Sequence, residues 1–94
     1  MRDEQFEWDD RKAATNLRKH GISFEVGRRV FDDPGNFEGL DESEDYGEER
    51  FLATGIVSGV FLTVSYTERG KRVRIISARR ATQNEQDDYF IQNG

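Results

Sequence analysis

The residues best suited to chemistry are a group of cations near the end of the chain. Between Tyr66 and Thr82 there are six basic residues and one acid, Glu68, which gives a local balance of +5. The six are Arg69, Lys71, Arg72, Arg74, Arg79 and Arg80. Because the whole chain carries a formal charge of −5, the remainder sums to −10. Cations gathered in one part of an acidic protein predict a site for an anion, and nucleic-acid phosphate is the first candidate.

Composition narrows the chemistry and the class of protein. The 94 residues predict one domain, 1–94, and include no cysteine and one histidine, so neither a thiolate zinc site nor a histidine-based catalytic zinc site is expected. No cofactor is predicted. No segment approaches the roughly 20 apolar residues of a membrane span, and the acidic start lacks the pattern of a signal peptide. We therefore expect a cytoplasmic protein.

An acidic stretch runs from Asp32 to Glu49, with nine acids and no base. Its pattern predicts a short edge strand followed by a loop. A solvated connection is the simpler interpretation. The alternative is a magnesium site, although nothing in the spacing imposes octahedral geometry. Its ligands would be Asp41, Glu42, Asp45 and Glu48.

Two predicted hairpin turns set the register of the sheet. A turn at Ser58-Gly59 places Val57 opposite Val60 and Phe51 opposite Tyr66. A turn centred on Arg69-Gly70 places Tyr66 opposite Val73. Both turns give the same core face, because side chains alternate along a strand. That face consists of Phe51, Ala53, Gly55, Val57, Leu62, Val64, Tyr66, Val73 and Ile75.

The opposite face is predicted to be basic at one end and apolar at the other. Arg50, Thr67 and Arg72 lie side by side in this register, with Arg74 in the next row. Simple alternation places Arg79 on the core side, unless the strand ends near Ala78. The apolar end consists of Ile56, Phe61, Ile76 and Ala78.

Helices are predicted before and after these strands. Phe6 and Trp8 alternate with polar residues, as in a short strand. A helix over 11–20 follows, capped by Asp9 or Asp10 and ended by Gly21, and a second begins at Ser23 and ends before Pro34. The helix over 11–20 has an apolar stripe of Ala13, Ala14 and Leu17.

The last helix begins at the capping box Thr82-Gln-Asn-Glu85 and reaches about Gln92. Its apolar residues are few, which predicts a helix that is mobile or shared with a partner; they are Tyr89, Phe90 and Ile91. The expected fold is α+β, a mostly antiparallel sheet with two N-terminal helices on one face and a C-terminal helix, in the order β-α-α-β-β-β-β-α.

Short motifs are distributed along the chain. In order, they are Phe6-Glu-Trp-Asp9, Lys12-Ala13, Asn16, Lys19-His-Gly-Ile-Ser-Phe24, Val30-Phe-Asp-Asp-Pro34, Gly47-Glu48, Arg50, Gly55, Tyr66-Thr-Glu-Arg69 and Arg74-Ile-Ile-Ser-Ala-Arg79. This series of motifs spans nearly the whole chain and resembles the BrnT toxins of bacterial type II toxin–antitoxin systems. The resemblance implies a RelE/ParE-like fold and a ribonuclease that blocks translation. It also implies neutralisation by a BrnA-type antitoxin, whose ribbon-helix-helix region binds DNA so that the pair represses its own operon.

A metal-free ribonuclease needs a base for the 2′-hydroxyl, a cation for the phosphate and an acid for the leaving 5′-oxygen. Arginine suits the phosphate because its planar fork holds two oxygens. The candidates are Arg50, Arg74 and Arg79, with Arg69, Lys71, Arg72, Arg80 and Thr67 as RNA contacts. For the base, Glu68 and His20 remain open. Tyr66 could stack on a nucleobase or donate a proton, but it ranks below the arginines because its predicted register turns it toward the core.

A second class of function also remains open. The chain is either a translation-blocking ribonuclease or a catalytically inactive partner that binds an antitoxin and acts in transcriptional regulation. The antitoxin is expected to contact Tyr89, Phe90 and Ile91, since the last helix has too few apolar residues to anchor itself well.

Overall fold

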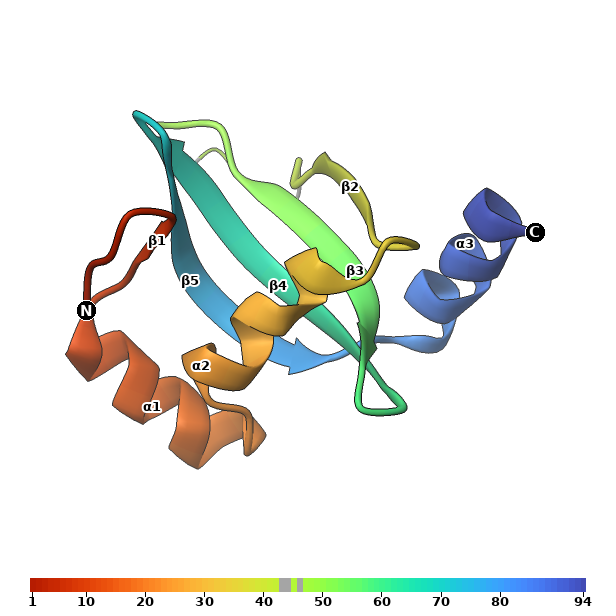
Figure 1. Cartoon of the computed structure of the whole chain (residues 1–94), viewed down its shortest axis with the longest axis horizontal. Helices are drawn as coiled ribbons and strands as arrows, with labels where there is room; N and C mark the ends of the chain where they lie inside the picture. Colours follow the sequence, from red (N-terminus) through yellow and green to blue (C-terminus); the bar gives the residue numbers. More distant parts are fainter. Residues whose placement is uncertain (43–44, 46) are drawn as a thin grey trace.

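The computed structural model describes residues 1–42, 45 and 47–94, so residues 43–44 and 46 of the predicted acidic loop lie outside the described residues. One five-stranded sheet has the order β1-β5-β4-β3-β2 (Figure 1). β1 is parallel to β5 and the other pairs are antiparallel, so the sheet is mixed. The predicted α+β fold and element order are confirmed. The elements are β1 (Phe6–Glu7), α1 (Asp10–His20), α2 (Phe24–Gly27), the 3-10 helix η1 (Arg28–Asp32), β2 (Phe37–Leu40), β3 (Phe51–Val57), β4 (Val60–Arg69), β5 (Arg72–Arg80) and α3 (Gln83–Asn93).

The helix ends follow the local signals in the sequence. Asp9 caps α1 by accepting hydrogen bonds from the backbone N–H groups of Arg11 and Lys12, and Gly21 ends it in the left-handed conformation. Ser23 caps α2, which continues as η1. Thr82 and Glu85 form the predicted capping box of α3.

The first hairpin has the predicted register. Val57 pairs with Val60 and Phe51 with Tyr66. Ser58 and Gly59 both have positive φ, 50° and 80°. This is the pattern of a type I′ turn, whose twist matches that of the two strands.

The second hairpin turns one residue later than predicted. Arg69 pairs with Arg72, so the two central residues are Gly70 and Lys71, and Tyr66 lies opposite Ile75 rather than Val73. Gly70 has φ +59°. A type II′ turn needs glycine at the first central position, which explains the shift. Because pairs move by two residues when a turn moves by one, each side chain near the turn stays on its predicted face.

A bulge farther along β5 changes the faces of the residues after it. Ser77 pairs with Ser65 and Ile75 with Tyr66, so Ile76 has no partner across the strand. Such an extra residue reverses the alternation that follows it. Ala78, predicted on the polar face, is therefore buried in the core opposite Val64, and Arg79, which simple alternation placed on the core side, lies opposite Thr63.

The predicted core face is confirmed and is covered by α2 and η1 (Figure 1). Phe24 and Val30 come from this covering segment and are fully buried. Gly27 lies so close to the sheet that a Cβ there would come within 2.8 Å of the Ala78 Cβ. Contact at this distance requires glycine, so α2 is positioned by the bulged end of β5.

Beside β5, α1 contributes Asn16 rather than the predicted leucine. Leu17 is 49% exposed, whereas Asn16 is buried and its amide donates to the Ala78 carbonyl (2.7 Å) and accepts from the Ala78 N–H (3.1 Å). A third bond goes to the Ile22 carbonyl. The asparagine therefore satisfies both backbone groups of Ala78 at this edge of the sheet.

The other end of the molecule is formed by α3 (Figure 1). Tyr89 is buried against Phe61 and Phe37, and its hydroxyl donates to Asp33 at 2.9 Å. The helix thus covers part of the apolar end of the face opposite the core, where Phe61 would otherwise be exposed to water. None of the helices in the described part of the chain is both long and apolar enough to cross a membrane.

Candidate functional site

The sheet face opposite the core, which we call the open face, carries a row of polar residues across its strands. Glu7 pairs with Arg74 in the parallel β1–β5 register, and Arg74 lies opposite Thr67 on β4. Arg50 comes immediately before β3, whose first residue, Phe51, pairs with Tyr66. The antiparallel register therefore places Arg50 alongside Thr67. We call Glu7, Arg74, Thr67 and Arg50 the arginine row.

A close ion pair occupies one end of this row. Arg74 Nη1 donates to Glu7 Oε2 at 2.7 Å, with side chains 27% and 16% exposed. The pair is partly withdrawn from water but still reachable. Sequence reasoning missed Glu7: alternation with Phe6 and Trp8 indicated its face, but the pairing of β1 with β5 has no local signal.

The other end of the row holds Arg50. Its Nε lies 3.7 Å from Glu48 Oε2, and Arg69 Nη2 lies 3.5 Å from the second oxygen of that carboxylate. Thr67 is buried and donates to the carbonyl of Glu49 at 2.8 Å. Its hydroxyl therefore positions the segment that carries Arg50 instead of pointing outward to RNA.

Two more predicted RNA contacts lie toward the hairpin turn. Arg72 Nε donates to the Asp3 carbonyl at 2.7 Å, and Lys71 is exposed within the turn itself. Arg80 lies opposite Leu62, so it is exposed on the core side of the sheet, away from the row. Arg69 and Arg72 thus extend the positive charge of the row, while Arg80 does not.

Arg79 is on the open face but apart from the row. It lies opposite Thr63, four residues along β4 from Thr67, a separation of about 13 Å. Its guanidinium donates to both oxygens of Glu85, at 2.7 and 3.0 Å. Burial alone would raise the pKa of Glu85, but the hydrogen bonds from Arg79 and from the Thr82 backbone outweigh it and lower that pKa. This bidentate pair ties α3 to β5.

Two predicted acid–base residues face away from the row. Tyr66 is 3% exposed and packs against Phe31 and Phe51. Burial, reinforced by Glu38, raises the pKa of Tyr66, so its phenol stays neutral. Glu68 lies opposite Val73 and points to the core side of the sheet, where it is exposed.

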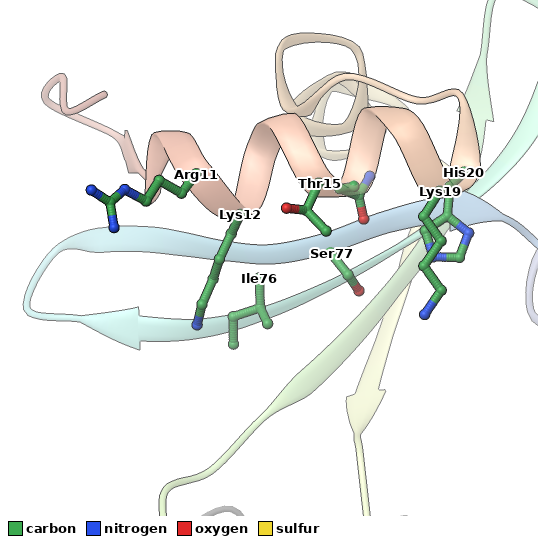
Figure 2. Close-up of a pocket in the computed structure, with 8 residues that line it drawn as sticks. Arg11, Lys12, Thr15, Lys19, His20, Ile76 and Ser77 are labelled. Carbon is green, nitrogen blue, oxygen red and sulfur yellow. The ribbon is translucent and has the colours of Figure 1, made fainter.

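His20 lies in a separate groove between α1 and β5. Lys12, Lys19 and the bulge residue Ile76 line the same groove (Figure 2). The structure therefore brings together Arg50, Thr67 and Arg74 with the unpredicted Glu7, and leaves His20, Tyr66, Glu68 and Arg79 outside that group.

The three residues expected to bind an antitoxin differ in exposure. Tyr89 is packed within its own chain, whereas Phe90 and Ile91 are 58% and 74% exposed. Phe90 still touches Phe61 with its ring. Only part of α3 is therefore free to meet a partner.

The magnesium site considered for the acidic loop is not formed. Among the described residues, no group of three or more His, Asp or Glu side chains could hold a metal ion. Asp41, Glu42, Asp45 and Glu48 all belong to the described residues. Glu48 instead lies between Arg50 and Arg69.

Comparison with known proteins gives one family. The family model described as "Ribonuclease toxin, BrnT, of type II toxin-antitoxin system" matches residues 8–85, which include Arg50, Thr67 and Arg74. A search of curated proteins found no match. Since the match covers most of the 94 residues, the chain belongs to the BrnT family of ribonuclease toxins of type II toxin–antitoxin systems.

Proposed function

We propose that this toxin is a metal-independent endoribonuclease that cuts mRNA at the arginine row and so inhibits translation in the cytoplasm. The observation that carries the proposal is the Glu7–Arg74 ion pair, which shares a row on the open face with Arg50. A carboxylate next to arginines supplies the base and the phosphate ligand that RNA cleavage requires. Glu7 replaces Glu68 and His20 as the assigned base.

The chemistry follows from the positions of these groups. The Glu7 carboxylate takes the proton of the 2′-hydroxyl, and the 2′-oxygen attacks the adjacent phosphorus. A 2′,3′-cyclic phosphate forms as the bond to the 5′-oxygen breaks. Only Nη1 of Arg74 is bonded to Glu7, so its other N–H groups can hold the phosphate oxygens together with Arg50. The leaving 5′-oxygen must gain a proton, and we assign water at this open face as the acid that donates it.

Replacing Glu7 by glutamine is the direct test of this assignment. Because glutamine still accepts a hydrogen bond from Arg74 but cannot take a proton, we expect cleavage of purified RNA to slow by about a hundredfold or more. The thermal midpoint should change little. Cleavage is measured with and without a chelator, and the wild-type rate should be insensitive to chelation.

Two other glutamates serve as comparisons in this test. Glu4→Gln removes the same charge from an exposed position of the same segment and should leave the rate unchanged. Loss of cleavage in Glu68→Gln, with a normal rate in Glu7→Gln, would transfer the role of base to Glu68. Absence of cleavage by the wild-type chain would favour the inactive antitoxin-binding partner.

We further propose a BrnA-type antitoxin that docks on the exposed end of α3, the pair then repressing its operon through the antitoxin's DNA-binding region. Support comes from the exposed Phe90 and Ile91. Their joint replacement by serine should weaken the complex more than tenfold, about 1.4 kcal/mol, in a binding titration. Gln92→Ser on the same helix is the control, and unchanged affinity of the double variant would rule out this docking site.

A further inference from the structure

A basic groove runs between α1 and the bulged part of β5. We propose that this groove binds backbone phosphates of single-stranded RNA on one side of the bond cut at the arginine row. The inference rests on the proposed function, since it extends the path of the same substrate. Figure 2 shows the side chains that line the groove.

The groove presents several cations along one helix. It encloses about 310 Å³ and is lined by four basic or titratable residues of α1. Lys12 and Lys19 are seven residues apart on the same side of the helix, a rise of about 10.5 Å. At this spacing the two ammonium groups can contact two different phosphates of one RNA strand. The four residues of α1 that line the groove in this way are Arg11, Lys12, Lys19 and His20.

The nearby acids do not neutralise these cations. In the portion of the chain that the structure describes, no ion pair joins Lys12 or Lys19 to a carboxylate. Asp9 is close enough to Lys12 for the lysine to contribute to its lowered pKa, but its main partners are the backbone N–H groups of the helix cap. Asp10 is bound to the amino terminus at 3.2 Å. The ammonium groups therefore remain available to a ligand.

The floor of the groove suits a nucleic acid. Ile76, displaced by the bulge, offers an apolar surface, and the hydroxyls of Ser77 and Thr15 lie beside it (Figure 2). Apolar surface next to hydroxyl donors and cations fits a ribose-phosphate backbone, whose sugar and phosphate need both kinds of contact.

The groove and the arginine row are separate, but both border β5. Arg74 and Ser77 are three residues apart on that strand, a separation of about 10 Å. Arg74 also contributes to the lowered pKa of Asp9, as Lys12 does, so both cations lie near the same carboxylate. An RNA strand held at Arg74 can thus pass directly into the groove. This arrangement favours RNA over a separate acidic protein as the ligand of the groove.

The test uses a short single-stranded 2′-O-methyl RNA, which cannot be cleaved, and measures its binding to the full chain by fluorescence anisotropy at several salt concentrations. Lys12→Gln with Lys19→Gln should weaken binding roughly tenfold near physiological salt, because two phosphate contacts are lost. The slope of log K against log salt should become shallower by about 1.4.

The control variant, Arg29→Gln with Arg80→Gln, removes the same charge from two exposed positions away from the row and the groove. It should change both quantities much less. Equal losses in both variants, unchanged binding in the lysine variant, or no binding by the wild type would each overturn the proposal. Unchanged RNA affinity with weakened antitoxin affinity would assign the groove to an acidic partner instead. Since the probe is not cleaved, these results are independent of the Glu7 test.

Discussion

Replacement of both Arg50 and Arg74 by alanine is expected to abolish RNA cleavage and toxicity. Each preorganised charge contact to a transition state typically contributes on the order of a hundredfold in rate, so two independent contacts give roughly ten-thousandfold. The measurement is single-turnover cleavage of purified RNA. The fold should persist, since both side chains are partly exposed and neither belongs to the core cluster.

A conservative variant separates the role of Arg74 in the reaction from a role in folding. Arg74→Lys keeps a positive charge beside Glu7 but loses the planar fork, so it should lower the cleavage rate while leaving the thermal midpoint near that of the wild type. Arg29→Ala with Arg80→Ala, at two exposed positions away from the row, is the matched double variant for net charge. Cleavage at the wild-type rate by a folded Arg50/Arg74 variant would place the active site elsewhere, and Arg79 would be the next residue to replace.

The replacement of Asn16 by alanine is expected to lower the free energy of unfolding by about 3 kcal/mol, because it leaves the buried N–H and C=O groups of Ala78 without their partners. For a domain of this size that loss corresponds to a fall of roughly 15 °C in the thermal midpoint. Thermal and denaturant unfolding measure it.

The matched control is Asn84→Ala, at an exposed position of α3, which should change stability by less than about 0.5 kcal/mol. A loss below about 1 kcal/mol in Asn16→Ala would mean that water replaces the amide and that the bulged edge is not sealed by this side chain.

The parts of the fold that depend on neighbouring residues alone could be predicted from the sequence. Asp9, Ser23 and Thr82 each satisfy backbone N–H groups within three residues, so they mark helix starts whatever the remainder of the chain does. Ser58-Gly59 likewise determines its hairpin through its own backbone angles. The core face followed because alternation along a strand is local, and even a turn placed one residue too early preserved it.

Other features depend on contacts between residues distant in the sequence. The bulge at Ile76 has no glycine or proline to mark it, and it moves Ala78 into the core and Arg79 onto the open face. Asn16 meets Ala78 from 62 residues away, so its burial could not be distinguished from that of Leu17 by helical spacing.

The candidate site also combines features set by neighbouring residues with features set by contacts between residues distant in the sequence. Arg50 and Arg74 share the open face because hairpin register is encoded locally, and this much was predicted from the sequence. Glu7 joins them only through the parallel pairing of β1 with β5, which brings together strands separated by more than sixty residues. Local signals do not specify such a pairing, because its energy comes from packing Phe6 and Trp8 into a core that other elements have formed. The sequence therefore determined which cations lie together, and the tertiary structure decided which carboxylate lies beside them.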